Sequence, residues 1–545
     1  MDSARGLIAA ASVVLMRAGN DALEFLMLRR SASARAFAGA YVFPGGMLDV
    51  EDSEQRALQR LVGVTEEQAA RRLRLPGPQA LAHWIAAVRE CCEETGVLLA
   101  VDAEGNVPTA DCLRQLAGAQ HFIDRLERAQ LHVAADTMPY IAHWITPPVQ
   151  PRRFDTRFFL AELPAQQQVR VDGVEMIDAQ WLGAVEILER ERRGELKLGS
   201  IATRRILMDL VEFATPAAAL AHAVSVPLVA ENRPRVAHGR EGRRFFNHGD
   251  APYAEIGWVD PDESGQTGYE LEVGTPKVLD RHCRRLLAPN AGFMTGPGTN
   301  TYLIGEREIA VIDPGPDDPV HIDAIVAHAG GPIRWIFLTH THPDHAPGAQ
   351  ALQRLTGAPI LGGGPTAVRS CDVTFDRILT DQEQCPIGAL QLRAIHTPGH
   401  ASNHFCYLLE STRMLFSGDH LVQGFTVVIA PPDGNMRAYL DSLQRLHALD
   451  CAIIAPGHGF LIGEPKQEIE RVIRHRLARE HKVLQALREQ GGSGTLASLL
   501  PRVYDDVSVS LHALATRSLE AHLQKLLEDG QLLQRQGRWS FARPT

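Results

Sequence analysis

The stretch Trp335-Ile336-Phe337-Leu338-Thr339-His340-Thr341-His342-Pro343-Asp344-His345 decides how the second half of this chain folds. Its four apolar residues predict a short buried strand, and three histidines and one aspartate follow that strand within a few positions. Loops at the carboxyl ends of strands form the crevices where α/β proteins bind ligands. Imidazole and carboxylate groups suit Zn²⁺. The stretch therefore predicts a metal site at the end of a strand.

Three later motifs supply further candidate ligands, each in a glycine-containing turn after an apolar run. They are Pro398-Gly399-His400, Ser417-Gly418-Asp419 and Pro456-Gly457-His458. One histidine in such a turn would usually be structural. Five histidines and two aspartates in these positions instead predict a metal centre. An earlier apolar strand, residues 309–312, ends at Asp313.

This set of motifs resembles the metallo-β-lactamase superfamily across residues 275–465. The resemblance implies an αββα sandwich with two Zn²⁺ ions whose shared water ionises near neutral pH. It implies that Asp344 orients the resulting hydroxide and that Asp313 supports the metal-binding loop from behind. The implied ligands are His340, His342 and His400 for one metal and Asp344, His345 and His458 for the other, with Asp419 bridging both.

Several stretches resemble the "β-lactamase-like protein" branch of this superfamily, which includes a mitochondrial single-strand endoribonuclease. They are residues 289–292, 298–303 and 417–419, and His475-Arg476-x-x-Arg479-Glu480 beyond His458. In that branch a small winged-helix-like domain follows. Here residues 467–490 predict a long polar helix, the leucines of 511–527 predict a second helix, and residues 531–541 predict a terminal β-wing.

A second candidate site lies in a helix predicted over residues 79–95. Glu90, Glu93 and Glu94 are spaced i, i+3 and i+4, so they project from one face. Like charges at this spacing repel one another, and a purely structural helix gains nothing from them. Carboxylates suit Mg²⁺, which keeps waters and substrate phosphates as its other ligands. The alternative is a solvated acidic helix face.

The surrounding residues, 89–97, resemble the end of the Nudix box, and Gly46 corresponds to its first glycine. Asp52 stands where that family has glutamate, with Glu51 as the alternative, and residues 53–88 hold an insertion that the pair Thr65 and Gln68 predicts to be helical. The resemblance implies an α/β/α sandwich that uses Mg²⁺ or Mn²⁺. It implies Glu93 and Glu94 as metal ligands, Glu90 as the base or the group that orients the water, and Arg89 as the residue that orients the carboxylates.

The segment before the box resembles coenzyme A-type Nudix diphosphatases. Arg30, Arg35 and Gly39, followed by Phe43-Pro44-Gly45-Gly46, fall at the spacings of that element. The resemblance implies that Arg30, Arg35, Gly45 and Gly46 contact the substrate, and arginine is a good partner for nucleotide phosphates. The alternative is a basic loop that caps the sheet.

Composition sets the limits of this interpretation. The chain has 545 residues, is 45% hydrophobic and carries a net charge of −10, which excludes a mainly disordered chain and one that coats nucleic acid. We expect a multidomain α/β and α+β protein: a Nudix domain (1–215), a connector or small β extension with strands near 224–229 and 269–273 (216–274), a metallo-β-lactamase-like domain (275–465) and a winged-helix-like domain (466–545).

The last domain is the only basic one. It holds 13 Lys and Arg against 9 Asp and Glu, a balance of +4 that suits either an anionic ligand or a solvated packing domain. The eight cysteines include no Cys-x-x-Cys pair, which predicts a reduced cytoplasm. The sequence holds no run of 18 apolar residues, so it predicts no membrane span. The sequence leaves the oligomeric state open.

Three functions follow from these patterns. The first is a bifunctional hydrolase whose Nudix half cleaves a CoA-like nucleotide diphosphate and whose other half hydrolyses a thioester or ester, with an acyl-CoA-like molecule as the substrate. The second is RNA processing, with the β-lactamase-like half cutting single-stranded RNA. The third is a nucleotide-sensing regulator that binds DNA, which is the weakest because a pure binder would not need five Zn²⁺-type histidines.

Overall fold

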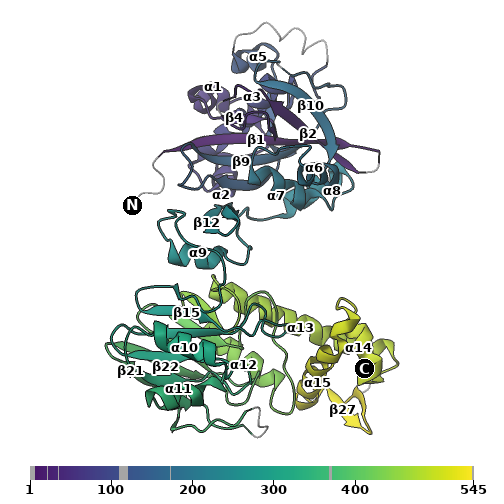
Figure 1. The fold of residues 1–545 in the computed structure, drawn as a ribbon. Helices are drawn as coiled ribbons and strands as arrows, with labels where there is room; N and C mark the ends of the chain where they lie inside the picture. Colours follow the sequence, from purple (N-terminus) through teal and green to yellow (C-terminus); the bar gives the residue numbers. More distant parts are fainter. Residues whose placement is uncertain are drawn as a thin grey trace. The chain divides into compact units, whose positions relative to one another are not determined.

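A computed structural model describes residues 6–20, 22–34, 36–109, 121–171, 173–366 and 371–542 of the chain (Figure 1). It divides into two compact units, Met1–Pro234 and Arg235–Thr545. Within the described ranges, no helix is both long and apolar enough to cross a bilayer. The predicted substrate residue Arg35 lies outside the described residues.

The first unit is built on a mixed sheet in the order β10-β2-β1-β9-β8-β11. Its first two strands in the chain pair antiparallel, with Met16 opposite Phe25, and β1 runs parallel to β9. Short strands β3 and β4 pair with β2 and β1. The bounds are β1 (Leu7–Ala18), β2 (Leu23–Arg30), β3 (Tyr41–Val42), β4 (Gly45–Met47), β8 (Tyr140–Ile145), β9 (Arg153–Glu162), β10 (Met176–Gly183) and β11 (Glu231–Asn232).

Helices cover both faces of this sheet, which makes the predicted α/β/α sandwich. One hydrophobic core lies under α3 (Gly77–Thr95), where Trp84 packs against Phe159 of β9. The other core lies under three helices: α6 (Ala184–Arg192), α7 (Ile201–Leu210) and α8 (Pro216–Ser225). The long helix α3 ends at Gly96, whose φ of 69° is the left-handed conformation that glycine adopts most easily.

The insertion predicted between Asp52 and Arg89 is largely helical. Thr65 caps α2 (Glu66–Leu73) in the predicted box, since the Gln68 amide donates to Thr65 Oγ1 at 3.2 Å and the Thr65 amide to Gln68 Oε1 at 2.9 Å. A small separate sheet, β5-β7-β6, lies beside α3. The remaining bounds are η1 (Val50–Ser53), α1 (Gln55–Leu58), β5 (Leu61–Val62), β6 (Ala100–Val101), α5 (Phe122–Arg128), β7 (His132–Ala134) and η2 (Ala135–Thr137).

The two strands predicted near 224–229 and 269–273 are wrong. Residues up to Ser225 belong to α8, because Thr215 caps this alanine-rich segment and Pro216 occupies its first turn. Around residues 268–273 the structure has only single bridges, one of which joins Val273 to Leu287. The segment instead holds the hairpin β12 (Arg235–Gly239) and β13 (Gly242–Phe246) and the helix α9 (Tyr253–Val259).

Within the second unit, residues 235–274 pack onto the remainder of the unit through a buried ion pair. Glu255 of α9 accepts two hydrogen bonds from the Arg285 guanidinium, at 2.5 and 2.9 Å, and a third from the Leu461 amide at 3.1 Å. Both charged side chains are buried, and each offsets the cost of burying the charge of the other.

The second unit is the predicted αββα sandwich. One sheet runs in the order β14 to β20 and the other β21 to β25, and a hydrophobic core lies between them. Helices α10 and α11 cover the outer face of the first sheet, while α12 and α13 cover the second. The bounds are β14 (Lys277–Val278), β15 (Cys283–Leu287), β16 (Asn300–Ile304), β17 (Ile309–Ile312), α10 (Pro319–His328), β18 (Ile333–Phe337), α11 (Gly348–Thr356), β19 (Ile360–Gly362), β20 (Arg377–Ile378), β21 (Glu383–Ile387), β22 (Leu390–His396), β23 (Phe405–Leu409), β24 (Met414–Gly418), α12 (Met436–His447) and β25 (Ile453–Pro456).

The chain ends in the predicted winged-helix arrangement. The long helix α13 leads into two further helices and a small sheet in the order β26-β28-β27, whose last two strands form the wing. Trp539 of the wing is buried in a core shared with α13, α14 and α15. The bounds are α13 (Pro465–Glu489), β26 (Ser493–Thr495), α14 (Leu496–Val503), η3 (Val509–Leu511), α15 (His512–Glu528), β27 (Leu532–Arg535) and β28 (Arg538–Phe541).

Candidate metal centres

The histidine-rich loop after β18 is fixed by Asp313, which follows the neighbouring strand β17. Asp313 Oδ1 accepts from the Thr339 amide at 2.8 Å, and Oδ2 accepts from Thr339 Oγ1 at 2.6 Å. The same Oδ2 lies 2.8 Å from Nδ1 of His345. This contact leaves Nε2 of His345 facing the interior of the site.

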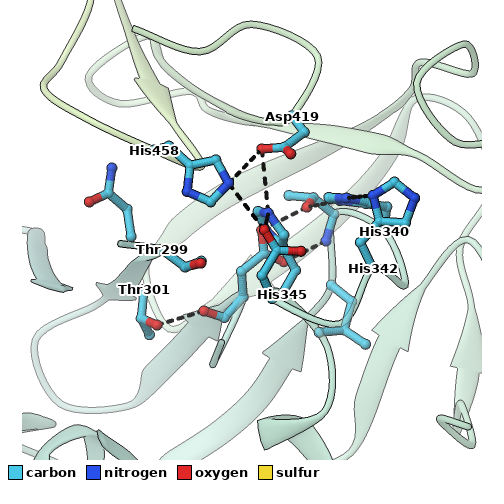
Figure 2. A network of polar contacts seen from close by, with 12 residues as sticks. Thr299, Thr301, His340, His342, His345, Asp419 and His458 are labelled. Carbon is cyan, nitrogen blue, oxygen red and sulfur yellow. Dashed lines mark hydrogen bonds and ion pairs between the residues drawn. The ribbon is translucent and has the colours of Figure 1, made fainter. Parts of the chain in front are cut away.

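All seven residues predicted as ligands of this centre come together, in two groups. Within each group one possible ligand atom from every residue lies within 4.8 Å of the others. In the first, Nδ1 of His342 lies 2.9 Å from Nε2 of both His340 and His400. The second contains Asp344, His345, Asp419 and His458. Figure 2 shows His458 and Asp419 facing one another above His345.

Charge in the second group is strongly coupled. Burial acts to lower the pKa of His458, but the charge of Asp419 and the contacts with both Asp419 and Asp344 together outweigh it and raise that pKa to about 9. His345 is likewise raised well above its ordinary pKa against its burial, mainly by Asp344 and Asp419. In the first group, burial and the neighbouring His342 lower the pKa of His400 to about 4. The group that contains the carboxylates therefore attracts positive charge, and the other presents neutral imidazoles, which are the form that binds metals.

The donor set fits bound divalent cations. Nε2 of His345, Nε2 of His458 and Oδ1 of Asp419 are all buried and none makes a hydrogen bond. The two imidazole nitrogens lie only 3.4 and 3.2 Å from that carboxylate oxygen. Buried polar atoms left without hydrogen bonds are costly, and ligation by a metal would satisfy all three.

A clamp around His458 comes from the strand β16. Nδ2 of Asn300 donates to the carbonyls of Pro456 and Gly459, at 2.9 and 2.8 Å, and so holds the loop on both sides of His458. The Gly298 carbonyl lies 3.1 Å from Nδ1 of His458, which directs Nε2 toward the metal groups. Asn300 lies within residues 298–303, which resemble the family branch, but nothing in the sequence marks it as a support for His458.

Two further buried histidines, His404 and His420, lie beside the predicted ligands, and the sequence predicted no role for them. The ring of His404 lies 5.2 Å from that of His340, and its Nδ1 contacts Thr397 Oγ1 at 2.9 Å. His420 follows Asp419 directly, and neither of its ring nitrogens has a hydrogen-bond partner. Their signal in the sequence was proximity alone, since each lies within four positions of a ligand.

Two loops border the metal groups and expose apolar side chains. The loop before β16 carries Phe293 and Met294, which are 68% and 46% exposed, and the loop after Asp419 carries Phe425, which is 38% exposed. Both loops contact the segment that carries His458, through the Gly298 carbonyl and through the Gln423 amide, 3.5 Å from the His458 carbonyl. We call these two loops, residues 289–299 and 420–435, the mouth of this centre, and the large hydrophobic side chains that they expose are Phe293, Met294 and Phe425.

The acidic helix of the first unit is organised around Arg89. Its guanidinium makes two hydrogen bonds to the buried carboxylate of Asp52, at 3.0 and 2.9 Å. It also donates to Glu90 at 2.9 Å, to Glu93 at 3.2 Å and to the Met47 carbonyl at 2.9 Å. Burial works against its charge, but Asp52 raises the pKa of Arg89 further above its ordinary value. Asp52 is thus the buried partner of an arginine.

The other glutamates lie against the glycine turn of β4. Glu94 is buried and accepts from the Gly45 amide at 2.9 Å, while Glu90 lies so close to Gly46 that a Cβ there would be 2.4 Å from its carboxylate. Burial raises the pKa of Glu94 to about 8 and that of Glu90 to about 6. Burial disfavours the ionised form of both carboxyl groups, and a bound cation would stabilise that form.

The three glutamates are not among the groups of converging ligands found within the described ranges. Glu90 and Glu93 both accept hydrogen bonds from Arg89, whereas Glu94 accepts one from the Gly45 amide. Arg30, predicted to contact substrate, lies 3.7 Å from Glu175, and its charge acts on Glu94.

Comparison with known proteins identifies three family models that match the chain. They describe the metallo-beta-lactamase superfamily (residues 294–458), the NUDT19 Nudix domain (56–201) and the beta-lactamase associated winged helix domain (495–539). The three matches confirm the resemblances predicted from the motifs.

Individual proteins are similar to parts of the chain. An "Atrochrysone carboxyl ACP thioesterase" of Aspergillus chevalieri is 33% identical over 264 residues, which are 46% of this chain and 80% of that protein. The "Beta-lactamase-like protein 2 homolog" of Caenorhabditis elegans is 30% identical over 257 residues, 45% of this chain and 84% of that protein. A crystal structure of a NUDIX hydrolase from Alicyclobacillus acidocaldarius is 30% identical and covers 39% of this chain and 96% of its own, with a TM-score of 0.34.

Proposed function

This chain belongs to the metallo-β-lactamase superfamily and also carries a Nudix domain, and we propose that it hydrolyses two kinds of bond at two centres. The centre of the second unit would use two Zn²⁺ ions to hydrolyse a thioester or ester of an apolar acyl group. The Nudix centre would use Mg²⁺ or Mn²⁺ to hydrolyse a nucleoside diphosphate derivative, with a CoA-like molecule favoured. An acyl-CoA would offer both bonds in one substrate.

The observation that carries the thioester proposal is the apolar mouth. Phe293, Met294 and Phe425 are exposed on the two loops that contact the His458 segment, where an acyl chain would cover them. The two loops that hold them, residues 289–299 and 420–435, contain no lysine or arginine. An RNA strand needs cations along its phosphates. The mouth therefore favours an apolar acyl group over a polyanion, and one relative carries the name thioesterase.

Each ligand residue has a defined part in this proposal. His340, His342 and His400 would hold one cation, Asp344, His345 and His458 the other, and Asp419 would contact both. The cations would polarise the substrate carbonyl and lower the pKa of water, so that the water ionises near neutral pH and can attack. The side chain of Asp344 is 24% exposed, against 11% for Asp419. Asp344 would therefore orient the attacking water, accept its proton and release that proton to solvent.

The Nudix proposal rests on the family match and on the buried carboxylates. Glu93 and Glu94 would hold the cation, and Glu90, whose pKa burial raises to about 6, would act as the base near neutral pH or orient the water. Arg89 would keep Glu90 and Glu93 in place. Arg30, Arg35 and the backbone at Gly45 and Gly46 would contact the diphosphate.

Turnover by the full chain tests both halves separately. We would assay wild type, Glu94→Ala and Asp344→Ala with CoA, with a long-chain acyl thioester and with single-stranded RNA, in Mg²⁺ and in Zn²⁺. Glu410→Ala is the control, because Glu410 is a surface carboxylate of the second unit that pairs with Arg393. We expect Glu94→Ala to lose only CoA cleavage and Asp344→Ala to lose only thioester turnover. RNA cleavage lost only in Asp344→Ala would replace the thioester proposal, and CoA cleavage that survives Glu94→Ala would refute the Nudix assignment.

A further inference from the structure

The motif His475-Arg476-x-x-Arg479-Glu480 lies on the long helix α13 and has no place in the chemistry above. Its charged residues are buried: Arg476 is 4% exposed, Arg479 7% and Glu480 9%. Arg479 donates to the Val503 carbonyl and to Asp506, and Glu480 pairs with Lys525 at 2.9 Å, so these two residues hold the C-terminal helices to α13. Arg476 points instead into the metal-binding domain.

Arg476 holds the loop that follows Asp419. Its Nη2 donates to the Val427 carbonyl at 2.5 Å, and its guanidinium lies 5.4 Å from the ring centre of Tyr439 on α12. The next carbonyl along this loop, that of Val428, lies 3.0 Å from Nδ1 of the ligand His400. Two consecutive carbonyls therefore bind different partners: one is held by Arg476, and the other orients a metal ligand.

Tyr439 connects the same arginine to the turns that carry Asp419 and His400. Its hydroxyl donates to the His420 carbonyl at 2.8 Å, one residue beyond Asp419. Its backbone lies against Gly399, one residue before His400, where a Cβ would be 2.3 Å from the Tyr439 Cα. The arginine and the tyrosine ring thus support the turns of two predicted ligands, His400 and Asp419.

We propose that Arg476 is a positioning residue for the metal centre, acting through the Val427–Val428 carbonyls to set the orientation of the His400 imidazole. The helix that leads into the winged-helix domain would then be part of the metal centre, and its buried positive charge would serve this purpose instead of binding a polyanion. This inference rests on the proposed binding of metal by His400. Contacts of this kind commonly change metal affinity by about 10–100-fold.

Zinc binding by the full chain tests the inference without any substrate. We would compare wild type, Arg476→Met, which keeps the stem but not the guanidinium, and Arg476→Lys, which keeps the charge. Arg474→Met is the matched control, since Arg474 lies on the same helix with its side chain 69% exposed. Zinc affinity would come from competition with a chromophoric chelator, ligand geometry from the absorption spectrum of the cobalt-loaded protein, and folding from the melting temperature of the metal-free protein.

We expect Arg476→Met to weaken one of two zinc sites by about 10–100-fold and to change the cobalt spectrum, Arg476→Lys to restore part of the affinity, and Arg474→Met to match wild type. Native mass spectrometry would count zinc per folded molecule, so that a poorly folding variant is still informative. Unchanged zinc affinity and cobalt spectrum in folded Arg476→Met would overturn the inference, as would a loss of melting temperature with zinc per folded molecule intact. Failure of wild type to turn over thioesters would refute the proposed substrate and leave these binding results to decide the role of Arg476.

Discussion

Replacing Asp52 with alanine should destabilise the first unit by about 3 kcal/mol. The Asp52 carboxylate is 0% exposed and makes two hydrogen bonds to the buried guanidinium of Arg89. Breaking a buried pair by removing one partner typically costs about 3–5 kcal/mol, because the other charge stays buried. Arg89 keeps Glu90, Glu93 and the Met47 carbonyl, so we expect the lower end of that range.

Two further variants calibrate this value. Asp52→Asn keeps the shape and one acceptor, so it should cost about 1–2 kcal/mol. Glu54→Ala removes an exposed pair with Arg56, whose side chains are 46% and 41% exposed, and should cost about 0–1 kcal/mol. The order Ala at Asp52, then Asn at Asp52, then the Glu54 control is therefore part of the prediction.

Hydrogen exchange followed by mass spectrometry in increasing urea would measure these free energies on the full chain. Peptides from α3, which contains the buried Trp84, report on the first unit, and peptides from α12 serve as an internal reference for the second. The α3 peptides should open at lower urea in Asp52→Ala while the α12 peptides do not change. An effect of Asp52→Ala no larger than that of Glu54→Ala would refute the reasoning, since it would mean that the glutamates alone compensate Arg89.

Other predictions follow from single contacts. Gly46→Ala should reduce CoA cleavage at least about ten-fold and spare thioester turnover, because the new Cβ would lie 2.4 Å from the Glu90 carboxylate. Gly399→Ala should abolish zinc binding and thioester turnover and lower the melting temperature, because its Cβ would meet the Tyr439 backbone at 2.3 Å and its φ is +144°; wild-type zinc content would contradict this. Burial lowers the pKa of His83 to about 4 from 6.5, so the unfolded state binds more protons between these pH values and the first unit loses stability as the pH falls, by up to about 1.4 kcal/mol per pH unit. His83→Gln should flatten that slope in urea unfolding at pH 7 and pH 5, and an unchanged slope would exclude this histidine as the cause.

The seven residues predicted as ligands of the second unit could be found in the sequence because they follow short apolar strands, and the structure brings them together. The loop after β18 and the turns at His400, Asp419 and His458 are local features. The strands before Asp419 and His458, β24 and β25, are parallel neighbours in one sheet, whereas β18 belongs to the other sheet of the sandwich. The supports of those ligands were harder to predict. Asn300 holds the His458 loop across more than 150 positions of the chain, and nothing local to Asn300 announces this contact.

The orientation of charged side chains was the other gap. The spacing of Glu90, Glu93 and Glu94 predicts a shared face, but Arg89 has several acceptors within reach and only packing decides among them. The same holds for the basic C-terminal domain, since Arg476 contributes to its +4 balance in the sequence and the structure buries this arginine against Tyr439. The prediction of a strand near 224–229 was wrong for a simpler reason, because the helix that Thr215 caps continues through Ser225.

The buried pair between Glu255 and Arg285 limits where this gene can be divided. A shortened gene that starts at residue 275 would encode the whole sandwich, yet it would remove Glu255, which is the partner of the Arg285 guanidinium and the acceptor of the Leu461 amide. A gene that starts at residue 235 keeps both contacts. The transferable module is therefore the sandwich together with its small hairpin and helix, and recombination that preserves function should join a Nudix gene upstream of that segment and not behind it.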